Sequence, residues 1–284
     1  MTTTATHELR TVTAVRYVTP LRSGGSVPGV VEADDLGTYV VKFTGSAQGR
    51  KALVAEVIVG ELARRLGLRV PELVLMHFDP AVAEAEPHQE VQDLLRSSAG
   101  LNLGMDYLPG AADVTPHALH ADPVEAARII WLDAFTANVD RTVHSANLMV
   151  WPTSGHQEPR LWLIDHGAAL VFHHRWESAA DAVGKAYDFR HHVLGSRCPD
   201  LAAADAELAP RVSARLLREV VAAVPDEWLR EEPGFATPED VREAYVAHLA
   251  ARAKVSARWL PGNFRDAGQL GEGTPMSSAV RLFS

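Results

Sequence analysis

A glutamate on the apolar side of a helix is the feature that most constrains how this chain can fold. Apolar residues recur at helical spacing from about Lys51 to Leu66, and Gly67 is placed to end the helix. Glu56 lies within this pattern, and the residues at its helical spacings are apolar or glycine, with no basic residue among them. A buried charge without a partner is costly. Glu56 therefore needs a cation from elsewhere in the chain.

A lysine in a preceding strand is the candidate partner for Glu56. The segment Tyr39-Val40-Val41-Lys42-Phe43 has the β-branched and aromatic content of a strand. Strand alternation places Lys42 on the face opposite Tyr39 and Phe43. Taken alone, such a lysine also fits a solvated charge or the guard of an edge strand. Since Glu56 requires a cation, we expect Lys42 to pair with it.

Two aspartates, 25 residues apart, suggest phosphate chemistry. Asp140 follows the end of an expected helix, Asp165 ends the apolar run Leu161-Trp162-Leu163-Ile164, and Asn147 lies between them. Carboxylate and amide oxygens are ligands for Mg²⁺, which takes its remaining ligands from nucleotide phosphates and water. Asp165 and Asn147 are thus the predicted metal ligands, and Asp140 is the predicted catalytic base for an attacking hydroxyl. A capping or turn role for either aspartate alone stays open.

The chain has the polar residues of a kinase in the order found in kinases. They are a lysine in a strand, a glutamate in a helix, an aspartate in a loop and a later aspartate predicted to bind metal. The chain resembles the HipA-like kinase family, which is similar to the phosphatidylinositol 3/4-kinases and more distantly to protein kinases. The resemblance spans about residues 10 to 200 and rests on Tyr39-Val40-Val41-Lys42-Phe43, on Ala55-Glu56 with the stretch 61–72, on Asn138-Val139-Asp140-Arg141-Thr142 with Asn147, and on Leu163-Ile164-Asp165-His166-Gly167.

The resemblance implies roles for these residues. Lys42 would contact the phosphates of ATP, Glu56 would be its ion-pair partner, and Asp140 would be the catalytic base. Asn147 and Asp165 would hold Mg²⁺. The implied fold is α+β, a bilobal protein-kinase-like fold with a strand-rich N-lobe and a mainly helical C-lobe.

Three positions depart from the kinase pattern. Protein kinases and the better-studied HipA kinases place the loop asparagine five residues after the aspartate, where this chain has Ser145, and its first asparagine is Asn147. Thr142 replaces the histidine that phosphatidylinositol kinases and HipA carry after Asp-Arg, and His166 occupies the centre of the Asp-Phe-Gly-like tripeptide. The longer loop keeps an alternative open, in which the chain is a catalytically weak nucleotide-binding pseudokinase module.

Two further segments are candidate nucleotide contacts. The stretch around Ser23, Gly24 and Gly25 lies between two β-rich runs, where glycines let backbone N–H groups approach phosphates. It is equally compatible with a plain hairpin turn. In the run 103–110, the backbone of Met105, Asp106 and Tyr107 is expected to pair with the adenine edge, although a plain strand-to-turn segment fits as well.

The domain organisation follows from the kinase-like order of motifs. We expect a kinase-like N-lobe over residues 9–102 and a helical C-lobe with the catalytic loop and metal-binding aspartate over residues 103–284. Residues 79–98 are expected to form a helix or loop inserted between strands. A core helix from Asp122 to Asn138 is expected to deliver Asp140. Asp133 on that helix, and Glu61 on the earlier one, are expected to be exposed helix charges.

Composition narrows the function classes. The net charge is −9 without a basic block, so we expect no nucleic-acid partner. One cysteine, Cys198, excludes an intramolecular disulfide, and we find no apolar leader or 18-residue apolar run, which favours a cytoplasmic protein without membrane insertion. The predicted function is an ATP- and Mg²⁺-dependent transfer of the γ-phosphate to a hydroxyl acceptor, which is a protein serine or threonine, a small molecule or a lipid.

Overall fold

The computed structural model describes residues 8–21, 27–114, 121–151, 160–197 and 199–260. Five strands of the N-terminal part close into a barrel in the order β1-β2-β3-β5-β4. They are β1 (Arg10–Pro20), β2 (Gly29–Ala33), β3 (Thr38–Lys42), β4 (Leu73–Phe78) and β5 (Gly100–Asp106). The parallel pairing of β1 with β4 closes the ring, and the other pairs are antiparallel. The sequence predicted a strand over residues 39–43 and a strand-rich N-terminal part, but not the closure of the strands into a barrel.

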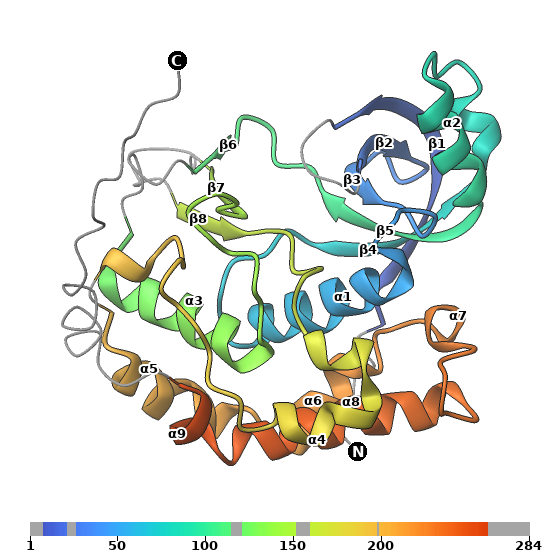
Figure 1. Cartoon of the computed structure of the whole chain (residues 1–284). Coiled ribbons are helices and arrows are strands. Elements are labelled where there is room, and N and C mark those ends of the chain that lie inside the picture. Colours follow the sequence, from blue (N-terminus) through green and yellow to red (C-terminus); the bar gives the residue numbers. More distant parts are fainter. Residues whose placement is uncertain (1–7, 22–26, 115–120, 152–159, 198, 261–284) are drawn as a thin grey trace, which may run out of the picture.

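The barrel is filled by alternate side chains of its strands. Tyr39, Val41 and Phe43 lie inside it with residues such as Val31 and Met76, and all are buried. Lys42, one position out of step, points to the other face, as strand alternation predicted. Helix α2 (Gln89–Ser97) and a short 3₁₀ turn (Pro80–Ala83) lie between β4 and β5, which confirms the expected insertion (Figure 1).

Helix α1 (Gly49–Arg65) is the central element of the molecule. Every residue from Ala52 to Ala63 is buried, so the helix is covered on all sides and not on one face alone. It contacts α6 (Ala214–Val221) and α7 (Asp226–Leu229) of the C-terminal part, and lies between the barrel and those helices in Figure 1. Burial of α1 from Ala52 to Ala63 explains why the prediction of an exposed Glu61 is wrong: this residue is 8% exposed and pairs with Arg64.

The C-terminal part contains a small sheet, a second largely buried helix and several shorter helices. Strands β6 (Ala112–Asp113), β7 (Leu148–Trp151) and β8 (Arg160–Leu163) form a small antiparallel sheet. Helix α3 (Pro123–Thr136) begins with the side chain of Asp122 accepting a hydrogen bond from Val124 N, and it is buried from Ile129 onward. The other helices are α4 (Ala179–Ala182), α5 (Leu201–Leu208), α6 (Ala214–Val221), α7 (Asp226–Leu229), α8 (Pro238–Ala253) and α9 (Ser256–Trp259).

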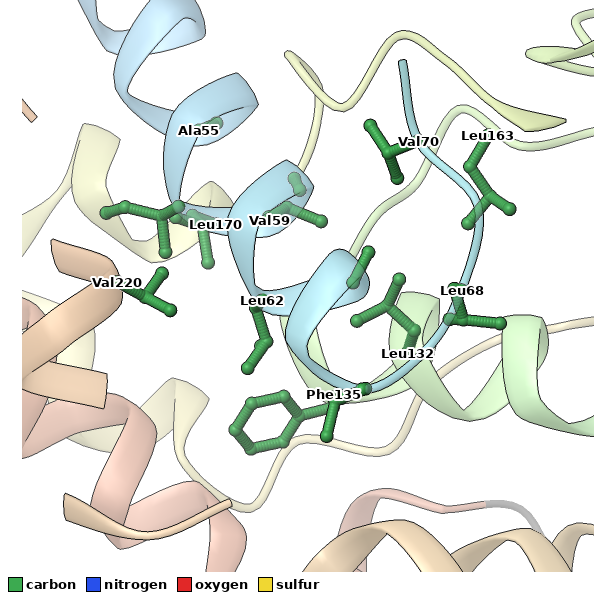
Figure 2. Close-up of a cluster of buried hydrophobic side chains, with 14 of the residues drawn as sticks. Ala55, Val59, Leu62, Leu68, Val70, Leu132, Phe135, Leu163, Leu170 and Val220 are labelled. Carbon is green, nitrogen blue, oxygen red and sulfur yellow. The ribbon is translucent and has the colours of Figure 1, made fainter. Parts of the chain in front are cut away.

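One hydrophobic core joins α1 to the C-terminal elements. Figure 2 shows Val59 and Leu62 of α1 beside Leu132 and Phe135 of α3, with Leu163 of β8 nearby. The same core includes Leu101, Leu103 and Met105 of β5. Strand β5 also belongs to the barrel, so it contributes to both parts of the molecule and crosses the boundary expected between residues 102 and 103. The division into two lobes stays a prediction. No helix among the described ranges is long and apolar enough to span a membrane.

Shortening a side chain in this shared core should destabilise the whole molecule. Leu62 is fully buried, so Leu62→Ala is expected to lower the free energy of unfolding by about 2–5 kcal/mol. Leu36 is 96% exposed, and Leu36→Ala should change it by less than about 0.5 kcal/mol. Urea unfolding of the two variants measures both values. Equal stability of the variants would contradict the central position of α1.

Candidate active site

Three segments meet at the ammonium group of Lys42. The lysine lies at the end of β3, and its Nζ forms an ion pair with Glu56 of α1 and another, at 2.7 Å, with Asp165 Oδ1. The side chain of Glu56 is fully buried and that of Lys42 is 11% exposed, whereas the Asp165 carboxylate is 38% exposed. The pairing predicted between Lys42 and Glu56 is present, and Asp165 joins it from a segment more than a hundred residues away.

Electrostatics keep the Lys42 cation charged. Burial by itself lowers the pKa of Lys42, but the charges of Glu56 and Asp165 outweigh burial and raise it. Burial raises the pKa of Asp165, yet Lys42 reverses this and leaves that pKa below its usual value. Complete burial raises the pKa of Glu56 despite Lys42. Asp165 is therefore the carboxylate that is both ionised and open to solvent.

A glycine allows these charged groups to approach closely. A Cβ atom at Gly167 would lie 3.3 Å from Glu56 Oε1 and 3.4 Å from the Ala52 side chain. A larger residue there would press on the buried glutamate. This close approach gives a physical reason for glycine two positions after Asp165.

Asn147 and Asp165 lie at the same end of a β-hairpin. Strands β7 and β8 are antiparallel with Leu148 opposite Leu163, so the residue before β7 and the residues after β8 are neighbours. Ile164 N donates to Asn147 O at 3.1 Å. Asn147 and Asp165 both adopt left-handed backbone conformations, with φ of 48° and 54°. Asparagine and aspartate tolerate this conformation better than other residues that carry a side chain.

The expected catalytic loop is a compact hydrogen-bonded unit. Asn147 Nδ2 donates to both the carbonyl oxygen and Oδ2 of Asp140, each at 3.1 Å. Ser145 Oγ lies 3.3 Å from Asp140 Oδ2 and 3.1 Å from Asn147 Oδ1. Ser145 and Asn147 thus both contact Asp140, and the loop with the longer spacing still brings an asparagine to the aspartate.

A buried arginine joins this loop to the segment that contains the predicted metal ligand Asp165. Arg141 is 1% exposed, and it donates through Nη1 to Asn147 O and, at 3.3 Å, to Ile164 O. Its Nε contacts Asp133 Oδ2 at 2.7 Å. Arg141 therefore binds the backbone of one predicted metal ligand, Asn147, and of Ile164, the residue before the other predicted ligand, Asp165.

Asp133 is a buried carboxylate whose position sequence reasoning missed. The prediction of an exposed helix charge is wrong: Asp133 is fully buried and accepts hydrogen bonds from Arg141, Asn138 and His192. The signal was present in the sequence, because Asp133 interrupts the apolar run Ile129-Ile130-Trp131-Leu132 and Ala134-Phe135. The same reasoning that found Glu56 would have found it.

Two histidines complete the network around Arg141. Arg141 Nη2 lies 3.2 Å from His166 Nδ1, and burial lowers the pKa of His166 to about 3. The imidazole is therefore neutral, and Nδ1 accepts from the arginine. His192 Nδ1 accepts from Leu194 N, which leaves Nε2 to donate to Asp133. His166, the residue after Asp165, is therefore held by a hydrogen bond to Arg141, at a position where an Asp-Phe-Gly tripeptide has an aromatic side chain.

The predicted nucleotide contacts are only partly described. Ser23, Gly24 and Gly25 lie outside the described residues, although the strands they connect, β1 and β2, are paired. Asp106 N donates to Glu72 O at 2.8 Å and Tyr107 N donates to Thr38 O at 3.0 Å. These two N–H groups are therefore already engaged within the protein.

The Asp133 network predicts a specific acid sensitivity. Burial raises the pKa of Asp133, but Arg141 and His192 outweigh burial and lower it to about 2. The unfolded value is about 3.9, so this carboxylate contributes stability above about pH 4 that is lost as the pH falls toward 2. Asp133→Asn should lower the free energy of unfolding by roughly 3–5 kcal/mol at pH 7, and the difference from wild type should shrink below pH 4.

Urea unfolding at pH values between 7 and 2 measures this difference. Asp93 has a 64% exposed side chain, so Asp93→Asn is a matched control that should stay close to wild type. A constant gap between Asp133→Asn and wild type across the whole pH range would contradict the ionised state of Asp133.

The overall fold is similar to that of solved kinase structures. The kinase CtkA of Helicobacter pylori superposes with a TM-score of 0.55 at 12% identity, covering 94% of this chain and 100% of that one. The Golgi casein kinase gives 0.51 at 13% identity, and its structure with Mn and ADP gives 0.52 at 14%; both cover 89% of this chain and 74% of theirs. At these identities the likeness concerns the fold, which is a kinase-like α+β fold.

The sequence itself gives the family. No curated protein matches it. The family model described as HipA-like kinase matches residues 15–260, which is most of the chain. The chain therefore belongs to the HipA-like kinase family.

Proposed function

We propose that this protein is an ATP- and Mg²⁺-dependent phosphotransferase that transfers the γ-phosphate of ATP to a hydroxyl group. The observation that carries the proposal is the position of Lys42, a buried cation held between Glu56 and Asp165. A lysine ammonium has three donors, and two of them are used by these carboxylates. The third is available for a phosphate oxygen.

Glu56 and Asp165 differ in what they offer to a ligand. Glu56 is enclosed, so its role is to fix the Lys42 side chain and balance its charge. Asp165 is partly exposed and ionised, and with the amide oxygen of Asn147 it provides the hard oxygen ligands that suit Mg²⁺. When bound, the ion would neutralise charge on the phosphate oxygens. The Golgi casein kinase structure with Mn and ADP supports the use of a nucleotide and a divalent cation in this fold.

Asp140 is placed to act as the base. Its Oδ2 accepts from Asn147 and Ser145, while Oδ1 has no hydrogen-bond partner among the described residues. Oδ1 can therefore take the proton of the acceptor hydroxyl as the hydroxyl oxygen attacks the γ-phosphorus, and the bond to the ADP oxygen breaks. Asn147 and Ser145 fix the orientation of the carboxylate for this step.

Removing the Lys42 charge should weaken nucleotide binding. Lys42→Met deletes a hydrogen bond between charged groups, so ATP affinity is expected to fall by roughly tenfold to a hundredfold. Glu56→Gln keeps the contact of Lys42 with Asp165 and should cause a smaller loss. Calorimetric titration with ATP and Mg²⁺ measures both.

Two controls make the lysine experiment specific. Lys254→Met changes an exposed lysine far from the site in sequence and should leave ATP affinity unchanged. The double variant Lys42→Met/Glu56→Gln removes the unpaired buried carboxylate that Lys42→Met would leave, so it separates nucleotide binding from stability. Unchanged ATP affinity in folded Lys42→Met would show that the nucleotide binds elsewhere.

The loop residues should separate chemistry from binding. A base acts in the transition state, so Asp140→Ala is expected to lower turnover by about 10²-fold or more while ATP affinity stays near wild type. Asn147→Ala should reduce both metal affinity and turnover, because Asn147 is a predicted ligand and also holds Asp140. Ser145→Ala removes one hydroxyl and should have a smaller effect.

Single-turnover phosphoryl transfer, or ATP hydrolysis without an acceptor, measured beside ATP affinity, tests all three variants. Damage from Ser145→Ala with a silent Asn147→Ala would place the metal ligand at the protein-kinase spacing. Nucleotide binding by wild type without any turnover would favour the pseudokinase alternative over the enzyme.

A further inference from the structure

His166 contacts both buried ion pairs of the site. Its backbone N–H donates to the carboxylate of Glu56, the partner of Lys42. Its Nδ1 lies 3.2 Å from Nη2 of Arg141, the partner of Asp133. His166 is itself fully buried. This residue therefore lies where the lysine site and the predicted catalytic loop meet.

The contact between His166 and Arg141 has a fixed direction. A guanidinium group has no acceptor, so Arg141 donates and Nδ1 of His166 accepts. An imidazole that accepts at Nδ1 carries its proton on Nε2, and this Nε2 is buried with no hydrogen-bond partner in the described part of the chain. An unpaired buried N–H is unfavourable, and a phenylalanine ring would avoid it. What histidine offers over phenylalanine here is therefore the acceptor at Nδ1.

This acceptor completes the hydrogen bonds of the guanidinium. Arg141 is 1% exposed, and its Nη1 donates to Asn147 O and Ile164 O. Its Nε donates to Asp133, and its Nη2 donates to His166. Each guanidinium nitrogen therefore has an acceptor within the protein. Loss of Nδ1 would leave Nη2 without its acceptor in the interior, which favours a displaced guanidinium.

Both predicted metal ligands depend on where the guanidinium lies. Asn147 and Asp165 have left-handed backbone conformations, with φ of 48° and 54°, and residues with side chains adopt these at a cost. Arg141 binds the carbonyl oxygen of Asn147 and that of Ile164, the residue before Asp165. A displaced guanidinium would release both carbonyl oxygens, so the two ligands would no longer be held in one arrangement.

We propose that His166 is a positioning residue for Mg²⁺: through Nδ1 it fixes the guanidinium of Arg141, and through Arg141 it holds Asn147 and Asp165 in the arrangement that binds the ion. This inference rests on the proposed function, because it concerns the metal of that reaction. His166 is not itself a ligand, since Arg141 occupies Nδ1 and Nε2 carries the proton. An aromatic residue, as in an Asp-Phe-Gly tripeptide, could not replace it in this chain.

The first experiment introduces that aromatic residue. Calorimetry measures ADP affinity in Mg²⁺ and in EDTA, and the ratio of the two affinities gives the contribution of the metal. His166→Phe should lower this ratio by roughly tenfold to a hundredfold, as expected when a group that orients a metal ligand is lost. ADP affinity in EDTA should stay near wild type, because the Lys42–Glu56 ion pair is retained.

A second pair of variants separates the position of the acceptor from its polarity. Asparagine places an amide oxygen near the position of Nδ1, whereas glutamine places it one carbon further along the side chain. His166→Asn should keep the metal contribution within about threefold of wild type, and His166→Gln should lose it as His166→Phe does. This pair tests the inference even where His166→Phe does not fold.

His173 provides a matched control. It is another fully buried histidine, and its Nδ1 lies 2.9 Å from Tyr245 Oη. His173→Phe should lower the free energy of unfolding in urea and leave the metal contribution unchanged. An equal loss of the metal contribution in His173→Phe would mean general destabilisation and would overturn the inference.

Two further outcomes contradict the positioning role. A wild-type ratio in folded His166→Phe would do so, and so would equal ratios in His166→Asn and His166→Gln. A wild type whose ADP affinity is the same in Mg²⁺ and in EDTA would instead overturn the Mg²⁺ dependence in the proposed function, and the inference with it.

Discussion

The ammonium of Lys42 is the interaction on which the arrangement of this protein depends. It joins the end of a barrel strand, the centre of α1 and the segment after β8, which are separate in sequence and come together only when the chain has folded. Burying a cation and a carboxylate rarely adds net stability, because desolvation offsets most of their attraction. The Lys42–Glu56 pair is therefore better explained by the position it gives to a charge than by the stability it adds.

A second buried ion pair, between Asp133 and Arg141, fixes the position of the loop, as the pair with Glu56 fixes the position of Lys42. Asp133 and Arg141 lie beneath the loop, and Arg141 uses its remaining donors on the carbonyls of Asn147 and Ile164 and on His166. Fixing a backbone carbonyl restricts the residue that carries it or follows it. The left-handed conformations of Asn147 and Asp165 persist because the surrounding contacts hold them.

Sequence reasoning identified residues that stand out from a local helix or strand pattern, but it did not identify contacts between distant segments of the chain. Glu56 could be predicted because its helical neighbours are all apolar, and Lys42 because strand alternation set it apart from Tyr39 and Phe43. The parallel pairing of β1 with β4 joins strands more than fifty residues apart, and strand patterns alone do not specify such a partner. Asp133 was misassigned although it interrupts an apolar helix as Glu56 does, and only the fold shows that its partners are Asn138, Arg141 and His192.

The two extra residues in the predicted catalytic loop show that the spacing in the sequence and the geometry in the fold can differ. A spacing of five residues would select Ser145, but Ser145 lacks an amide and can only link Asp140 to Asn147 by its hydroxyl. Asn147 reaches Asp140 because it lies immediately before β7, where pairing of β7 with β8 sets its position independently of the loop length. The additional residues can therefore be accommodated between Arg141 and Ser145, and the hairpin, together with Arg141, keeps the amide beside the carboxylate.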